Sequence, residues 1–170
     1  CLLLRGVACA GTFEIDSANS SLIFKLKHEN GYHIGAFQNF GGLMDVNDET
    51  GKLEGIMVLV DTRSINTRST SRDDVIRSET FFNVMIFPEA NFIGTKIEDG
   101  KLIGDITILG ITKEVTFDLK VGGTVKDEKG RQKVGLHAVG VIDRTDFGVS
   151  ENAKIGKQKM MGNDIIIEVQ

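Results

Sequence analysis

The sequence predicts an all-β protein, an antiparallel barrel or sandwich of about eight strands with one short helix. Three observations support this prediction. Several segments alternate apolar and polar residues with a period of two, which is typical of strands with one wet face and one apolar face. These segments recur at intervals of roughly 10–20 residues, separated by turn-forming residues. The chain also contains 20 glycines and one proline, a composition suited to the bends of a barrel.

The clearest alternation lies in residues 102–121. In the first half of this run, Ile106 and Ile108 lie on one face, and Gly110 separates the two halves as a hairpin turn would. In the second half, the apolar face consists of Val115, Phe117, Leu119 and Val121. The run therefore predicts two antiparallel strands whose shared apolar face must be covered by more sheet or by a ligand.

The other predicted strands follow the same reasoning. Residues 21–28 alternate so that His28 ends an apolar stripe and points inward, whereas residues 53–61 are apolar on both faces and leave their inward side open. Residues 32–40 are less regular and suggest a short helical turn. The remaining strands are expected from residue 43 onward and over 90–97, 133–143 and 164–169.

The predicted helix covers residues 72–78. Ser71 precedes this segment as an N-cap would, and Asp73 and Asp74 occupy its first turn, where acidic residues favour a helix start. These carboxylates could also serve acid–base chemistry, but the helix start explains them more simply.

The length of 170 residues predicts one domain, here residues 11–170, preceded by a short N-terminal segment. Residues 1–10 resemble the remnant of a secretory signal peptide, with cleavage expected after Ala10, and otherwise form a disordered tail or a lipid anchor at Cys9. We therefore expect a periplasmic or secreted protein. The formal net charge of −4 argues against nucleic acid as a partner.

Motifs for catalysis or cofactor binding are missing from the sequence. It contains no G-x-S-x-G, Walker A or G-x-G-x-x-G pattern, and the histidines 28, 33 and 137 lack the spacing of metal ligands. The acidic run 45–54 places Gly51 one position too late for a calcium loop. We therefore predict no cofactor and no metal. The inward His28 requires a polar partner, either a ligand head group or a backbone carbonyl.

Eight phenylalanines fall in or beside these elements. They would fill a solid core, or line a dry cavity in a barrel whose inner face is uniformly apolar. The pattern alone leaves both possibilities open. The set is Phe24, Phe37, Phe40, Phe81, Phe82, Phe92, Phe117 and Phe147.

Several short motifs, taken in order, resemble the YceI-like family of polyisoprenoid-binding proteins over nearly the whole chain. Early motifs are Ile15-Asp16, the 21–28 segment, Gly35-x-Phe37 and Ser64-Ile65-Asn66-Thr67. Later ones are Arg72-Asp73-Asp74 through Phe81-Phe82, Phe87-Pro88-x-x-x-Phe92, the Gly104 to Val115 run and Asp143-Arg144-x-Asp146-Phe147-Gly148. The sequence departs from the family pattern at Asn19, where the family usually has His.

The resemblance implies a lipocalin-like antiparallel barrel with an apolar pore for a polyprenyl chain or a similar long-chain lipid. It also implies that Met57 and Leu59 face outward, where their apolar side chains suggest a homodimer or another partner contact. The expected ligand-binding residues are Phe24, Leu26, His28, Ile56, Val58, Val60, Phe92, Ile106, Ile108, Phe117, Leu119, Leu136, Ala138 and Ile142.

Three functional hypotheses follow. The first is a non-enzymatic carrier that holds an isoprenoid, a quinone or a fatty amphiphile. The second is a hydrolase or isomerase of lipid-like substrates that uses His28. The third is a stress or scaffold protein that acts through its surface and has a solid core.

Overall fold

The computed structural model describes residues 10–28, 31–47, 49–130, 132–149 and 162–170. In these ranges the chain forms eleven strands and one α-helix, with two short 3₁₀ turns, η1 (Thr62–Ser64) and η2 (Arg144–Phe147). The helix is α1 (Thr70–Arg77). The strands are β1 (Ala10–Glu14), β2 (Leu22–His28), β3 (Gly31–Phe37), β4 (Phe40–Asn47), β5 (Leu53–Asp61), β6 (Ile65–Asn66), β7 (Glu89–Glu98), β8 (Lys101–Ile108), β9 (Ile111–Lys126), β10 (Gln132–Asp143) and β11 (Asp164–Val169).

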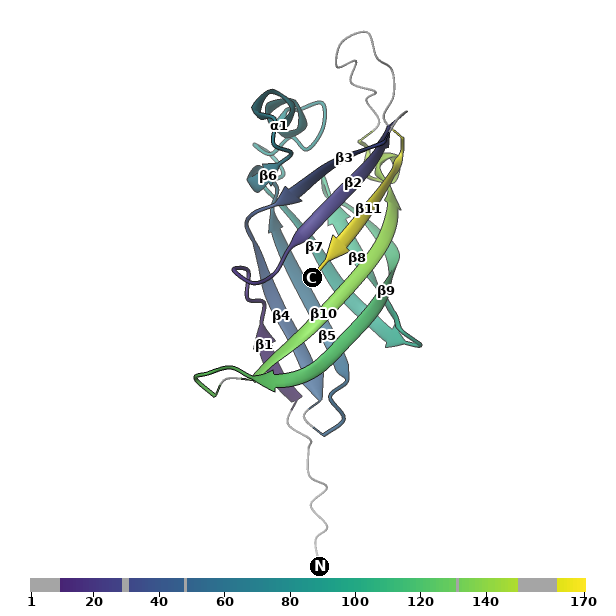
Figure 1. Ribbon diagram of the computed structural model, residues 1–170. Helices are drawn as coiled ribbons and strands as arrows, with labels where there is room; N and C mark the ends of the chain where they lie inside the picture. The colour runs from purple at the N-terminus through teal and green to yellow at the C-terminus, as the bar shows by residue number, and fades with distance from the viewer. Residues whose placement is uncertain (1–9, 29–30, 48, 131, 150–161) are drawn as a thin grey trace, which may run out of the picture.

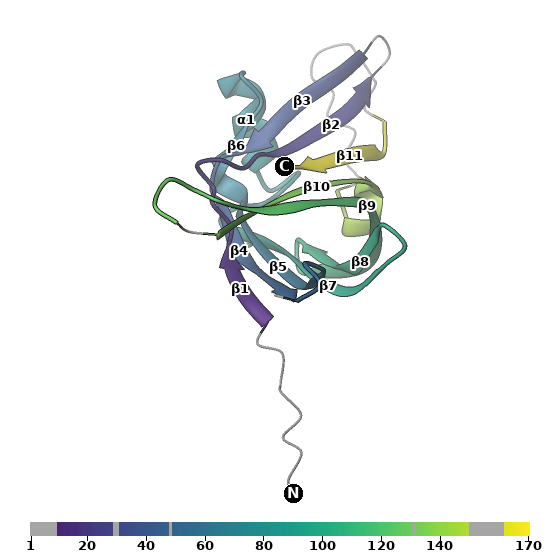
Figure 2. The same ribbon diagram turned by 60° about the horizontal axis from the view of Figure 1, so that its bottom comes forward.

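All strands belong to one antiparallel sheet with the order β1-β4-β5-β7-β8-β9-β10-β11-β2-β3-β6. Most neighbours in this order are consecutive in the chain, as expected for strands joined by short turns. The exceptions are the pairs β1/β4, β5/β7, β3/β6 and β11/β2, and the last of these joins the C-terminal strand to a strand near the N-terminus. Figures 1 and 2 show the sheet curling around a central axis, so the predicted lipocalin-like barrel is confirmed, with eleven strands in the described residues where about eight were expected.

The barrel closes along residues 31–47. The first part of this run, β3, pairs with β2 and β6, and the second part, β4, pairs with β1 and β5. Two backbone hydrogen bonds bridge the corner between them, from Gln38 N to Ser64 O at 3.2 Å and from Asp61 N to Asn39 O at 2.9 Å. Strands β3 and β4 lie near opposite ends of the strand order and follow each other in the chain. Their connection therefore brings the two ends of the sheet together, which reduces the length of exposed sheet edge.

Alternation along the strands places the core inside the barrel. In β5, Ile56, Val58 and Val60 are buried, whereas Met57 and Leu59 are exposed. The family resemblance implied this orientation, and the burial pattern confirms it. The same alternation buries Ile106 in β8 and both Phe117 and Leu119 in β9.

The strongest predicted hairpin is also confirmed. Strands β8 and β9 pair from Lys101 with Asp118 to Ile108 with Ile111, which leaves Leu109 and Gly110 as a two-residue turn. Both turn residues have positive φ, 53° and 74°, as the favoured hairpin turns require. Strand β9 continues to Lys126, farther than the alternation indicated, and forms a long hairpin with β10.

The prediction for residues 32–40 was wrong, because β3 is a regular strand. Its outward side chains include Tyr32 and Ile34, which are apolar and exposed, and one of its inward positions is Gly35. A strand is recognised by alternating polar and apolar side chains. That alternation is weak in β3, because outward positions are apolar and an inward position is a glycine. The strands β1 and β6 were also missed, since five and two residues are too short for a clear period.

The helix begins earlier than predicted. It starts at Thr70 with Ser69, not Ser71, as its N-cap, and it ends at Arg77. The acidic residue that suggested a helix start has a different role, because the Asp73 side chain accepts hydrogen bonds from Thr67 rather than capping the helix.

Other predictions fall on residues that the structure does not describe. The expected signal peptide covers mainly residues 1–9, which lie outside the described residues, so export stays a prediction. The side chain of His28 lies outside them as well. Within the described ranges, no helix is long and apolar enough to cross a membrane.

Candidate ligand-binding cavity

The barrel encloses a cavity of about 170 Å³. Among the described residues around it, only Asn91 and Arg144 are polar. The apolar lining consists of Leu22, Phe24, Leu26, Phe37, Ile56, Val58, Val60, Ile65, Ile76, Phe81, Phe82, Ala90, Phe92, Leu102, Ile106, Ile108, Phe117, Leu136, Ala138, Ile142, Val149, Ile165, Ile167 and Val169. Such a surface can bury apolar matter and offers few groups for polar recognition.

The structure brings most of the sequence-predicted site residues to this cavity. Leu119 is buried in the core but does not line the cavity, and the His28 side chain is not described. The predicted residues in the lining are Phe24, Leu26, Ile56, Val58, Val60, Phe92, Ile106, Ile108, Phe117, Leu136, Ala138 and Ile142. Whether these residues bind a ligand stays a prediction.

Two groups stand out among the lining residues that are absent from the predicted ligand-binding set. The first is on β11, where Ile165, Ile167 and Val169 face the cavity. Their spacing of two is a signal that could have identified them. The second group, which includes Ile76 and Phe82, comes from α1 and the segment after it, and these residues follow no strand period.

Two of the aromatic rings that line the cavity lie over glycines of a neighbouring strand. Phe117 pairs with Gly140, and a Cβ atom added at Gly140 would lie 2.5 Å from the Phe117 ring. Phe24 pairs with Gly35, where the corresponding distance is 2.3 Å. Because both rings occupy the space above a glycine, they lie against the wall, which leaves the centre of the barrel open.

Aromatic contacts continue from the wall to the cover of the cavity. Phe24 lies 5.7 Å from Phe37 between ring centroids, and Phe37 meets Phe82 edge-on at 5.9 Å and 75°. Edge-to-face contacts of this kind are favourable for aromatic pairs. They connect β2 and β3 to the segment that follows α1, which lies over one end of the barrel in Figure 1.

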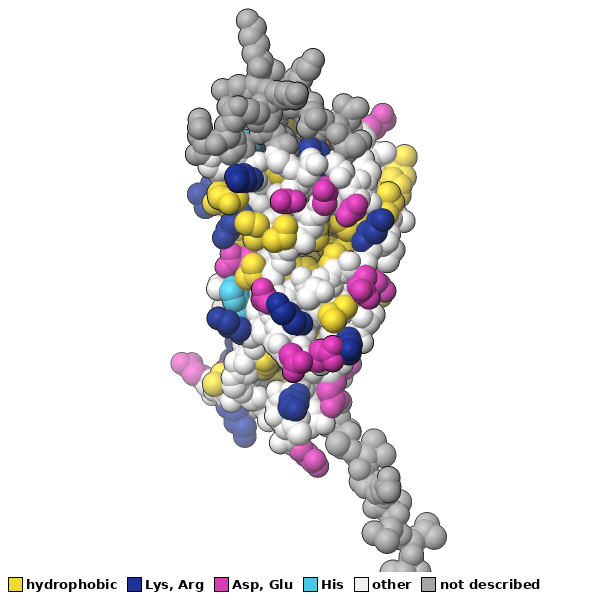
Figure 3. Space-filling model, turned by 90° about the vertical axis from the view of Figure 1, so that its right-hand side faces the viewer, with side chains coloured by type: hydrophobic (Ala, Val, Ile, Leu, Met, Phe, Trp, Pro, Cys, Tyr) yellow, Lys and Arg dark blue, Asp and Glu magenta, His cyan; other side chains and the backbone are white. Residues whose placement is uncertain are grey.

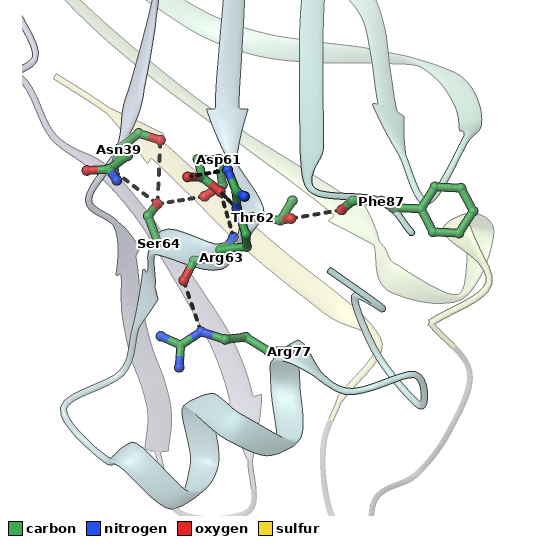
Figure 4. A network of polar contacts seen from close by, with 7 residues as sticks. All are labelled: Asn39, Asp61, Thr62, Arg63, Ser64, Arg77 and Phe87. Atoms are coloured by element: carbon green, nitrogen blue, oxygen red, sulfur yellow. Dashed lines mark hydrogen bonds and ion pairs between the residues drawn. The ribbon is translucent and has the colours of Figure 1, made fainter. Parts of the chain in front are cut away.

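A polar network holds this cover to the barrel (Figure 4). Arg77 of α1 donates from Nε to Arg63 O at 2.9 Å and from Nη2 to Ile65 O at 2.7 Å. Thr62 donates from Oγ1 to Phe87 O at 2.9 Å, which fixes the chain before β7.

The Arg63 guanidinium, hydrogen-bonded to Asp61 at 2.8 Å, holds the pKa of that carboxyl below its usual range. The turn η1 is thus an anchor between α1 and the strands.

A second, buried network lies at the start of α1. The Asp73 carboxylate, in a residue only 6% exposed, accepts hydrogen bonds from Thr67 N at 2.8 Å and from Thr67 Oγ1 at 2.6 Å. Arg72 donates from Nε to Thr67 Oγ1 at 2.8 Å, and its Nη1 lies 3.2 Å from His33 Nδ1 on β3. These contacts fix the helix against the sheet as well as satisfying a buried carboxylate.

Arg144 is the charged residue of the lining. It is buried, and its guanidinium donates to Gly162 O at 3.1 Å, Val149 O at 2.5 Å and Asn163 Oδ1 at 3.4 Å. Burial lowers the pKa of this guanidinium from its usual value. The neighbouring Asp143 does not pair with it through these bonds, because its carboxylate accepts from Thr145 N and Oγ1. The contacts of Arg144 hold the chain after β10 to the chain before β11.

The outer surface of the barrel carries mixed charges. Figure 3 shows acidic and basic side chains interspersed over one face, with apolar side chains among them. Met57 and Leu59 are exposed on β5, beside the similarly exposed Leu43 and Ile93 of β4 and β7. A dimer contact through these side chains stays a prediction. Among the described residues, no group of three or more His, Cys, Asp or Glu side chains is placed to hold a metal ion.

Comparisons with known proteins agree with this fold. A UPF0312 protein of Staphylococcus aureus (strain MSSA476) is 33% identical over 161 residues, which cover 92% of this chain and 93% of that protein. BcnA of Burkholderia cenocepacia superimposes with a TM-score of 0.71 at 19% identity, covering 91% of this chain and 96% of that one. A polyisoprenoid binding domain from Saccharophagus degradans, implicated in plant cell wall breakdown, superimposes at 0.63 with 11% identity, covering 95% and 96%.

A family model matches the chain over a similar range. The family model of the YceI-like domain matches residues 13–170, from β1 to the end of the chain. The matched range includes every strand after β1, helix α1 and all the residues that line the cavity. The chain therefore belongs to the YceI-like family.

Proposed function

We propose that this protein is a non-enzymatic binding protein that holds one long-chain amphiphile, such as an isoprenoid, a quinone or a fatty compound, in the cavity of the barrel. The observation that carries the proposal is the lining, in which Asn91 and Arg144 are the only polar residues within the part of the chain that the structure describes. An apolar chain gains about 25 cal/mol for each Å² removed from water, less the cost of ordering it. The barrel supplies that gain with few directional contacts, which favours binding by shape and hydrophobicity.

The size of the cavity suggests which part of such a ligand is enclosed. Each water-sized group requires roughly 10–15 Å³ of cavity measured in this way. A cavity of about 170 Å³ therefore holds on the order of a dozen groups of that size, such as methylene units. This matches two or three isoprene units or part of an acyl chain, so the rest of a longer ligand would extend past the cover.

The relatives support the same class of ligand. The chain belongs to the YceI-like family, and the Saccharophagus degradans domain that shares its fold is described as polyisoprenoid-binding. The alternative of a solid-core scaffold protein expects no cavity and is therefore disfavoured. The enzymatic alternative depends on His28, and no described contact favours it.

The proposal is tested by uptake of cis-parinaric acid, a polyene fatty acid that fluoresces in apolar surroundings. We expect saturable binding of one molecule per chain, competed by geranylgeraniol. The variant Ala138→Phe places a ring in the lumen from a buried position, and we expect it to weaken binding at least about tenfold, or 1.4 kcal/mol. In parallel, solvent extracts of the purified protein are examined by mass spectrometry for long-chain lipids.

The matched control is Val141→Phe, on the same strand. Val141 is exposed and faces away from the cavity, so this variant adds the same ring type outside the barrel. Its affinity should stay within about twofold of the wild type, since it changes no lining residue. Failure of the wild-type protein to take up the probe, or equal binding by Ala138→Phe, would contradict the proposal.

A further inference from the structure

The segment between α1 and β7 exposes two consecutive apolar side chains, Met85 and Ile86. Met85 is 90% exposed and Ile86 is 68% exposed, which makes them the two most exposed large apolar side chains among the described residues. Scattered single apolar residues on a surface are ordinary. Two adjacent ones, at positions in a turn where polar residues usually lie, are not explained by the packing of the fold.

This exposure is built into the backbone of the segment. Asn83 has a positive φ of 41°, and its carbonyl oxygen accepts hydrogen bonds from Ile86 N and Phe87 N, both at 2.9 Å. The Val84 side chain is buried beneath the turn, and Val84 N donates to Arg77 O at 3.2 Å. A fixed turn of this kind holds Met85 and Ile86 outward.

The turn adjoins the cavity. Phe81 and Phe82, which directly precede it, line the cavity. The same short segment therefore faces the lumen at its start and solvent at Met85 and Ile86, which we call the tip. On its other side, the Phe87 ring lies beside the β8–β9 turn, 3.2 Å from where a Cβ of Gly110 would be. Ile111, the first residue of β9 after that turn, is also exposed. The exposed apolar side chains therefore lie at the covered end of the barrel.

The segment that carries Met85 and Ile86 has balanced charges. Residues 68–87 include three arginines (Arg68, Arg72 and Arg77) and three acidic residues (Asp73, Asp74 and Glu79). A region without net charge gives little attraction to an anionic surface. Any partner of the tip must therefore be bound mainly through apolar contact.

We propose that Met85 and Ile86 insert into the surface of a lipid bilayer and dock the covered end of the barrel there. This inference rests on the proposed function, because a long-chain ligand is poorly soluble in water and has to come from a lipid phase. A convex tip of two side chains buries little against a flat protein surface, but it can enter the interfacial region of a bilayer. Docking at this end brings the cavity and the bilayer together, which shortens the path of the ligand through water.

The test measures binding of the full chain to sucrose-loaded phosphatidylcholine vesicles by sedimentation. We expect the wild type to sediment with the vesicles, and Met85→Gln/Ile86→Gln to bind at least about tenfold more weakly, since the burial of two large apolar side chains is lost. The addition of anionic lipid or of salt should change the wild-type binding little, because the tip carries no net charge.

The structure offers a closely matched control in Met57→Gln/Ile93→Gln. These residues are also a methionine and an isoleucine, 37% and 49% exposed, and they face each other across β5 and β7 on the outer wall. This variant removes the same side-chain types from a different surface. We expect its vesicle binding to equal that of the wild type.

A second measurement separates this inference from the proposed function. Each variant is loaded with cis-parinaric acid, and its transfer to vesicles is followed by fluorescence. Wild-type transfer should accelerate with vesicle concentration, as in a collisional mechanism, whereas transfer from Met85→Gln/Ile86→Gln should not. Probe affinity should be the same in both, because neither residue lines the cavity.

The outcomes are distinct. If the wild type takes up no cis-parinaric acid, the proposed function fails, whatever the vesicle result. If the wild type binds the probe but not the vesicles, or both double variants lose vesicle binding equally, the docking inference is overturned. It is also overturned if light scattering shows a wild-type dimer that Met85→Gln/Ile86→Gln dissociates without any effect on vesicle binding, because the tip then contacts a second copy.

Discussion

At the scale of single residues, Gly42 shows how closely the strands approach each other where the barrel closes. It lies in β4, opposite Val58 of β5, and its carbonyl oxygen accepts a hydrogen bond from Ile15 N at 3.0 Å. A Cβ atom added at Gly42 would lie 1.9 Å from the backbone oxygen of Met57. A backbone atom cannot rotate away as a side chain can, so any larger residue must separate the two strands.

We therefore expect Gly42→Ala to lower the free energy of unfolding by about 1–3 kcal/mol, the range for overpacked sites. Gly41→Ala is the control, because a Cβ at the neighbouring Gly41 would meet no atom within 4 Å. Its effect should remain within about 0.5 kcal/mol. Urea unfolding of both variants at neutral pH measures the difference, and equal midpoints would show that the strands can separate without cost.

Which single residues point inward was largely predictable. Strict alternation placed Phe117 and Ile106 on the inner face, and the family resemblance resolved the ambiguous β5 in favour of Ile56 and Val58. Alternation specifies a face, but not the depth along the barrel at which the lumen narrows. Leu119 accordingly faces inward and is buried, yet lies outside the cavity lining.

At the scale of elements, α1 and the segment after it depend on contacts that no local pattern encodes. Asp73 looks like a residue of a helix start, but its carboxylate accepts two hydrogen bonds from Thr67, a loop residue six positions earlier in the chain. The cover residues Ile76 and Phe82 reach the cavity because these contacts hold the helix against β3 and β6. Periodicity could predict a helix here, but not the surface on which it lies.

We expect Asp73→Ala to destabilise the protein by about 2 kcal/mol or more, because it leaves the Thr67 amide and hydroxyl without this acceptor in a buried site. The affinity for cis-parinaric acid should fall as well, since the cover of the cavity loosens. The control is Asp74→Ala, whose exposed carboxylate lies 3.4 Å from Arg77 Nη1. Surface pairs of this kind contribute little, so Asp74→Ala should leave both quantities nearly unchanged. Equal losses in the two variants would contradict the role given to Asp73.

At the scale of the whole molecule, the sequence could predict an antiparallel barrel but not its closure. Most strands pair with neighbours in the chain, which hairpin turns such as Leu109–Gly110 encode locally. The closure depends on two long-range features, the bent run 31–47 and the pairing of β11 with β2. Neither has a local signal: Gly35 weakens the alternation of β3, and β11 lies more than 130 residues from its partner.

The seam between β11 and β2 also carries charged groups on its outer face. Glu168 of β11 accepts a hydrogen bond from Lys25 Nζ of β2 at 2.7 Å, and its other oxygen lies 3.3 Å from His137 Nε2 of β10. Lys25, then His137, lower the pKa of the Glu168 carboxyl below its ordinary value of 4.5. The three side chains connect β10, β11 and β2 across this seam.

This arrangement predicts that part of the free energy of unfolding, the increment due to the ionised Glu168 carboxylate, is lost at acidic pH. A carboxyl whose pKa is lower in the folded than in the unfolded protein stabilises the fold at pH values above its unfolded pKa. That contribution is complete above about pH 5.5 and is lost as the pH falls through the lowered folded-state pKa of Glu168. In Glu168→Gln the increment should disappear, so the urea midpoint of this variant should fall less between pH 7 and pH 3 than that of the wild type. Lys25→Met should reduce the same increment, because it removes the larger cause of the shift. If the three proteins lose stability in parallel over this pH range, the seam contributes nothing to the acid response, and the closure of the barrel rests on backbone pairing and apolar packing alone.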